Sequence, residues 1–225
     1  MSDVKEVAGF KWFVPDEPFR NLPLEDWERS HRDWLIRNIP KGGTFIDIGA
    51  NTGIYAITLA HHFERVLAIE PASENAEVLR ENMKLNDIKN IYIYEYAAWD
   101  ENRLIDFHQC VEKDLASAAV ASDDPKPYGL IPVKTTRVLA VRIDSLQELG
   151  DVTAVKIDVE GGEARVILGM LETIRRCKPV MLIEVHEEPM LNFIRTFMQI
   201  LGYELENPDE FKRLAVLRFV PKGGK

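Results

Sequence analysis

The sequence changes from a strand pattern to a helix pattern within "TFIDIGANTGIYAITLA", residues 44–60. The first five residues predict a short buried strand at 44–48, and "NTGIYAITLAHHF" predicts the helix that follows. Between them, "DIGANTG" contains two glycines, which allow the backbone to turn sharply and to approach a ligand closely. A strand that enters a helix through such a loop is typical of an α/β fold with a parallel sheet.

Strand and helix patterns alternate along most of the remaining chain, which predicts a mostly parallel sheet with helices on both faces and right-handed crossovers. Near the end, "YELE" and "LAVLRFV" have no helix between them, which indicates an antiparallel finish to the sheet. The further strands are expected at residues 65–70, 90–96, 152–159 and 178–186, and the further helices at residues 72–86, 163–174 and 190–202.

Two segments do not follow this alternation. Residues 1–40 contain three of the four tryptophans, and Trp27, His31 and Leu35 fall on one helical face, so we expect a helical extension or lid there. The main domain is expected to cover residues 41–225.

The main domain is expected to carry an insertion at about residues 101–142. This stretch contains "RLIDFHQC", then a segment rich in proline, serine and aspartate, and then "PVKTTRVLAVRI". We interpret the two apolar runs as an inserted hairpin or ribbon that is joined by a mobile loop.

The composition limits the kinds of partner. The chain has 225 residues, of which 46% are hydrophobic, so it can bury a core, and its net charge of −9 disfavours a nucleic-acid partner. Cys110 and Cys177 lack a paired spacing, so no disulfide framework or zinc knuckle is expected and a reducing cytoplasm fits. The N-terminus has no apolar signal core and no run of about 18 apolar residues occurs, so no membrane partner is expected.

The loop after the first buried strand has the features of a nucleoside site. A helix N-terminus favours an anion, and Glu70 ends the next strand 21 residues after Gly49. A carboxylate in that position can accept hydrogen bonds from both ribose hydroxyls. A dinucleotide fingerprint aligned at Gly49 would need glycines at positions 51 and 54, where the chain has Asn51 and Ile54. The spacing D-x-G-x-N-x-G instead resembles the first motif of S-adenosylmethionine-dependent methyltransferases.

The resemblance extends along residues 42–186 to the FkbM family of methyltransferases. It rests on "FIDIGANTGIYA", "LAIEPASENAEVLRENMKLN", "YAAWD", "VKIDVEGGEARVILGM" and "KPVMLIEVH", which occur in the family's order. "KIDVEGGE" is the most specific of these, since most other methyltransferases of the fold lack it. The resemblance implies a Rossmann-like class I methyltransferase fold with a mostly parallel seven-stranded sheet and an antiparallel C-terminal strand. It also implies O-methylation of a hydroxyl, often on a sugar or natural product.

The same resemblance assigns the cofactor residues. Asp47, Gly49, Asn51 and Gly53 would hold the methionine end of S-adenosylmethionine. Glu70 would hold the ribose. The segment from Ala97 to Asp100, which includes Ala98, would lie by the adenine.

Charged residues cluster at the ends of the fourth and fifth expected strands. Alternation places Lys156 and Asp158 on one face of the fourth strand, with Glu160 just beyond its end. Glu184 and His186 share a face of the fifth strand. Because the fourth strand is expected to lie between the first and the fifth, Lys156 would be flanked by Asp47 and Glu184, and Asp158 would approach His186.

These residues are the catalytic candidates because open α/β sheets bind ligands beyond the carboxyl ends of their strands. An alcohol is a poor nucleophile until it loses its proton, so a carboxylate or a neutral histidine is needed as base. Asp158 and His186 are the first candidates and Glu160 the third. The three also resemble an oxygen and nitrogen site for a divalent metal, but metal ligation is the less favoured alternative, so no metal is expected. We expect Lys156 to be structural and Glu163 to favour a helix N-terminus.

Two other functions remain as alternatives. The segment "AIEPASENAEVLRENMKLN" also resembles helices of RNA base methyltransferases. However, "DVEG" follows the fourth strand where amino methyltransferases carry an Asn/Asp-Pro-Pro-Tyr motif, and the net charge of −9 opposes RNA. A non-catalytic cofactor-binding module is the other alternative, which the retention of Asp158, Glu160 and His186 disfavours.

Acceptor choice is expected to depend on residues 1–40 and 111–135, since the cofactor loops already account for the methyl donor. Trp12, Phe13, Trp27 and Trp34 offer flat surfaces that suit a sugar ring. For Trp27 and Trp34, sealing the edge of the sheet is an equal alternative.

Overall fold

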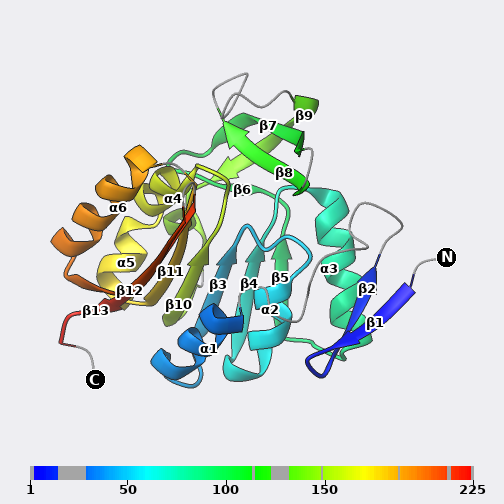
Figure 1. Ribbon diagram of the computed structural model, residues 1–225, viewed down its shortest axis with the longest axis horizontal. Helices are drawn as coiled ribbons and strands as arrows, with labels where there is room; N and C mark the ends of the chain where they lie inside the picture. Colours follow the sequence, from blue (N-terminus) through cyan, green and yellow to red (C-terminus); the bar gives the residue numbers. More distant parts are fainter. Residues whose placement is uncertain are drawn as a thin grey trace.

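A computed structural model describes residues 3–14, 29–112, 115–122, 132–147, 149–186, 188–211 and 214–223. The described residues form an α/β fold around a seven-stranded sheet with the order β12-β13-β11-β10-β3-β4-β5 (Figure 1). The strands are β3 (Thr44–Ile48), β4 (Arg65–Ile69), β5 (Ile91–Tyr94), β10 (Val152–Ile157), β11 (Val180–Val185), β12 (Tyr203–Phe211) and β13 (Leu214–Pro221).

The predicted sheet is confirmed in its direction and order. The five strands from β5 to β11 run parallel, and β13 pairs antiparallel with both β11 and β12. As expected, β10 lies between β3 and β11. The carboxyl ends of the parallel strands therefore meet along one edge, where the charged residues of β10 and β11 can come together.

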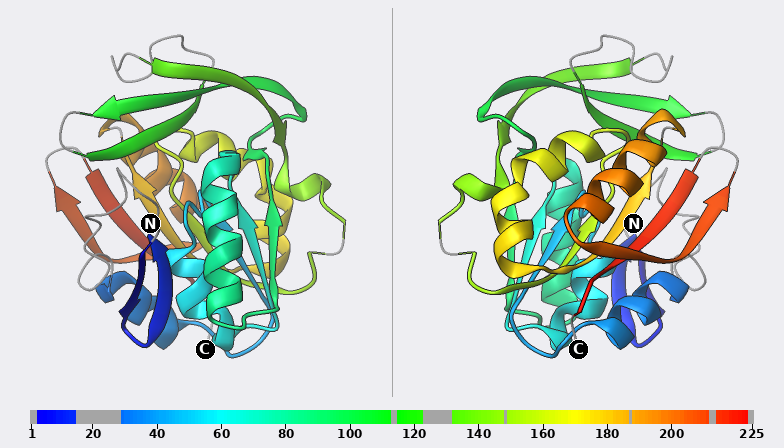
Figure 2. Two further views of the ribbon diagram at one scale, coloured as in Figure 1. Left: turned by 90° about the vertical axis from the view of Figure 1, so that its right-hand side faces the viewer. Right: turned by 90° about the vertical axis from the view of Figure 1, so that its left-hand side faces the viewer.

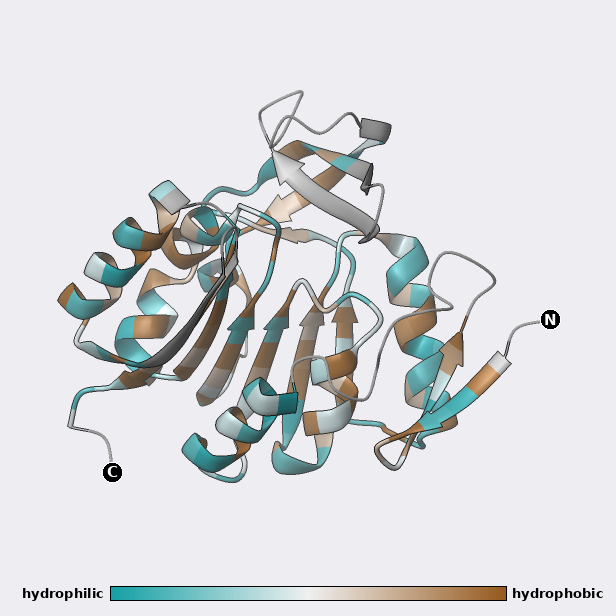
Figure 3. Ribbon diagram, in the orientation of Figure 1, coloured by the Kyte–Doolittle hydropathy of each residue, from teal (hydrophilic) through white to brown (hydrophobic). Residues whose placement is uncertain are grey.

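Helices cover both faces of the sheet (Figure 2). Alternation along the strands divides the core in two: Phe45 packs in the cluster with helices α1 to α3, whereas Ile46 packs in the cluster with α4 to α6. Figure 3 shows the largely hydrophobic central strands between helices that alternate in hydropathy. The helices are α1 (Arg29–Asn38), α2 (Ile54–Leu59), α3 (Ser73–Leu85), α4 (Glu163–Gly169), α5 (Leu171–Cys177) and α6 (Glu188–Ile200), and the 3-10 turns are η2 (Ala60–His62) and η4 (Ile143–Ser145).

The prediction of a single helix at residues 163–174 is wrong. It is divided into α4 and α5 at Met170, whose φ of −126° departs from helical geometry. Asp144 accepts hydrogen bonds from the backbone N–H groups of Glu172 and Thr173, which satisfies donors in the first turn of α5. A tertiary contact from η4 therefore fixes a boundary that the local pattern did not indicate.

The helical extension expected for residues 1–40 is only partly correct. Helix α1 is present, but residues 3–14 form an antiparallel hairpin of β1 (Asp3–Val7) and β2 (Phe10–Val14). Its turn places Ala8 and Gly9 at positive φ, which a two-residue hairpin turn of this kind requires but alanine seldom adopts. Trp27 lies outside the described residues.

The hairpin attaches to α3 through backbone groups. Asn82 and Asn86 accept hydrogen bonds from the N–H groups of Phe13 and Lys11 at 2.7 and 2.8 Å. Trp12 and Trp34 are buried in the core, so in this conformation neither presents the open aromatic surface that was considered for a sugar ring.

The insertion forms a second sheet at the carboxyl edge of the main sheet (Figure 1). The predicted pair of strands is present as β7 (Arg103–Glu112) and β9 (Pro132–Val141), which run antiparallel. The strands β6 (Ala97–Ala98) and β8 (Leu115–Ser122) extend it to the order β6-β9-β7-β8, and neither was predicted. Part of the expected loop, residues 123–131, lies outside the described residues. Among the described residues, no helix is long and apolar enough to cross a membrane.

Candidate active site

A cavity lies at the carboxyl ends of β3, β4 and β10, where an open parallel sheet is expected to bind its ligand. One wall comes from the loop after β3 and from the end of β4, and the other from β6 and the loop after β10. The insertion adds a side chain from β7. The lining residues are Ile48, Gly49, Asn51, Ile69, Glu70, Pro71, Asn75, Ala97, Ala98, Trp99, Phe107, Asp158, Val159 and Glu160.

The loop after β3 passes very close to the end of β10. Gly49 has a φ of 75°, and a Cβ atom there would lie 1.7 Å from the carbonyl oxygen of Asp158. Glycine is therefore required both for the backbone conformation and for the close approach. Asn51 has a φ of 49°, which asparagine tolerates better than most residues. The two residues place the loop backbone against the cavity.

Glu70 is almost completely buried at the end of β4, and its carboxylate is held by nearby N–H groups. Oε2 accepts a hydrogen bond from Asn51 N at 2.8 Å, and Oε1 accepts one from Ala72 N at 2.9 Å and one from Asn75 Nδ2 at 3.4 Å. Burial raises the pKa of Glu70 above its ordinary value, although these hydrogen bonds oppose the rise. The side chain thus faces the cavity in a fixed position.

Asp47 and Gly53 support the loop from behind the cavity. Asp47 is buried, and its Oδ2 accepts a hydrogen bond from Ala56 N at 3.0 Å in the first turn of α2. A Cβ atom at Gly53 would lie 2.1 Å from Leu79 Cδ1, so glycine lets α2 and α3 approach. The predicted cofactor residues therefore fall into two groups, because Gly49, Asn51, Glu70 and Ala98 line the cavity and these two residues do not.

Trp99 and Ala98 form much of the opposite wall. A Cβ atom at Gly169 would lie 1.8 Å from the carbonyl oxygen of Trp99, so α4 packs directly on this segment. Arg165 of α4 donates a hydrogen bond to Asp100 Oδ2 at 2.6 Å. The segment that was expected beside the adenine is thereby attached to α4.

Lys156 and Asp158 form an ion pair at the end of β10, with Lys156 Nζ 3.0 Å from Asp158 Oδ2. Lys156 pairs in register with Asp47, as predicted, and with Leu182 rather than Glu184 on β11. Burial acts to raise the pKa of Asp158, but the charges of Lys156 and His186 outweigh it and hold this pKa below its ordinary value. Asp158 is therefore ionised at neutral pH.

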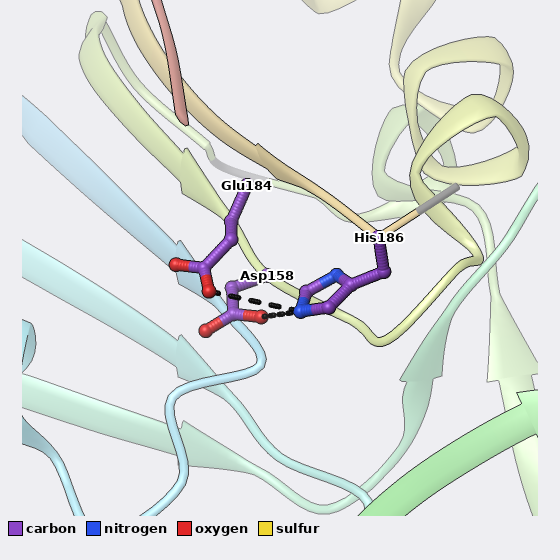
Figure 4. Close-up of side chains that lie close together, drawn as sticks. All are labelled: Asp158, Glu184 and His186. Carbon is purple, nitrogen blue, oxygen red and sulfur yellow. Dashed lines mark ion pairs between the residues drawn. The ribbon is translucent and has the colours of Figure 1, made fainter. Parts of the chain in front are cut away.

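His186 follows β11 and is surrounded by carboxylates. Its Nδ1 lies 3.1 Å from Glu163 Oε1, and its Nε2 lies 3.3 Å from Glu160 Oε2 and 3.8 Å from Asp158 Oδ1. Figure 4 shows Glu184 and Asp158 directed at the same ring, with Glu184 Oε1 at 3.6 Å from Nε2. Burial acts to lower the pKa of His186, but the hydrogen bond that its ring donates to Glu163 and the surrounding negative charges raise it to about 10.

The predicted approach of Asp158 to His186 is present, and Glu160 joins them. Glu163 was missed as a site residue. It does begin α4, as expected, but its side chain is fully buried and contacts both His186 and Gly161 N. The sequence offered little signal for this, because an acidic residue in a first helical turn is usually solvated.

Comparison with known proteins identifies the family. The family described as "Methyltransferase FkbM domain" matches residues 47–205. The chain belongs to the FkbM methyltransferase family. By its description, the matched family is a methyltransferase domain.

Solved structures of known proteins share the fold. A methyltransferase FkbM from Methylobacillus flagellatus KT has a TM-score of 0.56 at 18% identity, over 79% of this chain and 43% of that chain. M. jannaschii TYW2 in complex with AdoMet has a TM-score of 0.52 at 14% identity, over 98% of this chain and 86% of that chain.

A curated relative is similar over a shorter stretch. The tRNA/tmRNA (uracil-C(5))-methyltransferase of Shewanella pealeana is 36% identical over 70 residues, which is 30% of this chain. The chain spans about a fifth of that relative's length, since the match covers 19% of it.

Proposed function

We propose that this FkbM methyltransferase transfers the methyl group of S-adenosylmethionine to a hydroxyl oxygen of a small molecule or saccharide. One observation carries the proposal: Asp158 and Glu160 line the same cavity as Gly49 and Glu70. The cavity thus contains both a site suited to a nucleoside donor and carboxylates suited to removing a proton from an alcohol.

The donor end is the part of the cavity between Glu70 and Ala98. A carboxylate has about four lone-pair positions, and the hydrogen bonds to Glu70 from Asn51, Ala72 and Asn75 account for three. Ribose hydroxyls would add to these bonds or replace the long one from Asn75. The adenine would lie between the loop after β4 and Trp99, and the methionine end would reach Gly49 and the end of β10.

The acceptor end is the part of the cavity beside Asp158 and Glu160. Methyl transfer from a sulfonium is an in-line displacement, so the acceptor oxygen must be held at about 3 Å from the methyl carbon. An imidazolium cannot accept a proton, so the raised pKa of His186 favours Asp158 or Glu160 as the base. His186 then acts by holding the two carboxylates in place.

RNA is the second candidate acceptor, because the similarity to a tRNA/tmRNA methyltransferase favours it. The net charge of −9 opposes it, since a phosphate backbone is repelled by an acidic surface. The two candidates predict different dependence on salt, because RNA binding through basic residues weakens steeply as salt rises, whereas binding of a neutral glycoside changes little.

The test is a transfer assay with S-adenosylmethionine that carries a tritiated methyl group. Transcribed RNA, total tRNA, sugar nucleotides and neutral glycosides are offered separately, and label is counted in each after separation from the donor. We expect label in a glycoside or sugar nucleotide and its loss with Asp158→Asn. Label in RNA alone would overturn the hydroxyl proposal, and the absence of donor binding by calorimetry would overturn both candidates.

A further inference from the structure

We propose that Asp158, Glu184 and His186 bind one divalent transition-metal ion next to the acceptor end of the cavity, which Asp158 lines. The three side chains come from the end of β10, from β11 and from the residue after it. One possible ligand atom from each lies within 4.8 Å of the other two. The existence of the site does not depend on methyl transfer, but its role in binding and activating the acceptor hydroxyl rests on the proposed function.

The two distances from His186 Nε2 to the carboxylates are too long for hydrogen bonds and close to the separation of neighbouring ligand atoms in a coordination shell. His186 Nε2 lies 3.6 Å from Glu184 Oε1 and 3.8 Å from Asp158 Oδ1, which exceeds the usual range of an N–H···O bond. Ligands at about 2.0–2.2 Å from a metal ion lie roughly 3–3.6 Å apart when their angles are between square and tetrahedral. Figure 4 shows both carboxylates directed at the same ring nitrogen, so small side-chain rotations would bring the three atoms onto such a shell.

Glu163 supplies an independent observation that points to a cation. Its side chain has no exposure to solvent. Oε1 accepts a hydrogen bond from Gly161 N at 2.8 Å and also faces His186 Nδ1. Oε2 has no hydrogen-bond partner among the described residues. A buried carboxylate with an unsatisfied oxygen is costly unless positive charge lies close by. A metal-binding histidine commonly donates its second ring N–H to a carboxylate, which fixes the direction of the coordinating nitrogen.

Lys156 leaves one oxygen of Asp158 for the metal. It pairs with Oδ2 at 3.0 Å, while Oδ1 faces His186. The lysine therefore holds the carboxylate in the orientation that the site needs. A set of one imidazole and two carboxylates favours an ion such as Mn²⁺ over Mg²⁺, because the imidazole nitrogen suits transition metals. The metal would replace the proton on Nε2.

The site would specify a class of acceptor. Three protein ligands leave positions open on a metal ion, and two adjacent oxygens of a vicinal diol can occupy neighbouring positions. A coordinated hydroxyl loses its proton more easily, and Glu160, which lies 3.3 Å from His186 Nε2 and lines the cavity, would accept it. Asp158 would then act as a ligand rather than as the base. The preferred acceptor is therefore a saccharide with neighbouring hydroxyls.

The experiment is a Mn²⁺ titration of the chelator-treated full chain in the absence of donor and acceptor, with free Mn²⁺ measured by electron paramagnetic resonance. We expect one saturable site per chain and weaker competition by Mg²⁺. Glu163→Gln should raise the Kd for Mn²⁺ by about 10- to 100-fold, the usual effect of losing an outer carboxylate, and Glu184→Gln by at least as much.

The matched control is Glu204→Gln, which makes the same change at an exposed side chain on the edge strand β12 and should leave the Kd unchanged. Binding of S-adenosylhomocysteine at the wild-type affinity shows that each variant is folded. The proposal is overturned if the wild type shows no saturable binding below about 1 mM, the weak end for a protein metal site. It is also overturned if Glu184→Gln binds Mn²⁺ like the wild type. If Mn²⁺ binds while S-adenosylhomocysteine does not, the metal site stands and the proposed function fails.

Discussion

The charged side chains at the two ends of the cavity are held by different kinds of partner. At the donor end, two of the hydrogen bonds that Glu70 accepts come from backbone N–H groups, those of Asn51 and Ala72. At the acceptor end, Asp158 and His186 are held mainly by other side chains, those of Lys156 and Glu163. Backbone groups are present whatever the sequence, so the donor end depends on few side chains. The acceptor end depends on several side chains that act together.

This difference has a consequence for mutation. A change at the donor end should act locally on cofactor affinity, whereas a change at the acceptor end should act on turnover and spread through the cluster. Single substitutions at the two ends should therefore have separable effects.

The largest effect is expected from Asp158→Asn, which removes a charge from the acceptor end and leaves the donor end intact. Turnover on the true acceptor should fall by about 10²–10⁴, the typical loss when a group that activates the nucleophile is removed. Affinity for S-adenosylhomocysteine should stay near the wild-type value. Steady-state transfer of tritiated methyl and calorimetry measure the two quantities.

Glu160→Gln is the companion variant because it also changes a carboxylate that lines the cavity. Near-normal turnover by Asp158→Asn, together with a large loss in Glu160→Gln, would move the role of base to Glu160. A parallel loss of cofactor affinity in both variants would contradict the separation between the two ends.

A second large effect is expected on stability from Gly49→Ala, at the point where the two ends meet. The left-handed conformation costs alanine about 1–2 kcal/mol, and the overlap of the added Cβ with Asp158 O should add about 1–3 kcal/mol. We therefore expect the free energy of unfolding to fall by about 2–5 kcal/mol in urea titrations.

The control is Gly9→Ala in the N-terminal hairpin. Gly9 has a φ of 82° but no atom within 4 Å of an added Cβ, so only the conformational cost applies there. Equal losses in the two variants would show that the β3 loop can move away from β10, and the close approach would then not be a fixed feature of the site.

Features that depend on local sequence could be predicted, whereas contacts between side chains on different elements could not. The alternation of strands and helices, the loop at Gly49 and the position of Glu70 just after β4 follow from local patterns, and the structure has all three. The position of β10 between β3 and β11 was expected from the strand order of the fold rather than from a local pattern, and the structure confirms it. Glu163 was not predicted as a site residue, because its partner His186 lies on another strand and only the packing of α4 buries it. The hairpin was missed because Ala8 adopts a conformation that favours glycine.

A smaller effect is expected from Glu70→Ala at the donor end. Loss of hydrogen bonds to a charged group should weaken binding of S-adenosylhomocysteine by about 2–3 kcal/mol, as measured by calorimetry. Asn75→Ala should cost less, because Asn75 makes only the longest of the contacts to Glu70. Tighter binding of NAD than of S-adenosylhomocysteine by the wild type would contradict the assignment of the loop. Unchanged affinity in Glu70→Ala would place the ribose elsewhere.

The smallest effect is expected when a change of pH protonates Glu70 and thereby changes the affinity for S-adenosylhomocysteine. Burial raises the pKa of Glu70, so protonation is easier in the folded protein than in the unfolded chain, and the stability that comes from this difference is lost as pH rises through the folded-state pKa. Ribose hydroxyls donate hydrogen bonds, so they prefer the ionised form, and binding should weaken as pH falls through the same pKa. The loss should be smaller than in Glu70→Ala, because a protonated carboxyl group still accepts one hydrogen bond.

Calorimetry with S-adenosylhomocysteine from about pH 5 to about pH 8 should show this fall in affinity toward low pH in the wild type and a flatter profile in Glu70→Gln. An identical slope in the variant would assign the pH dependence to another group and would leave the backbone contacts of Glu70 as its main role.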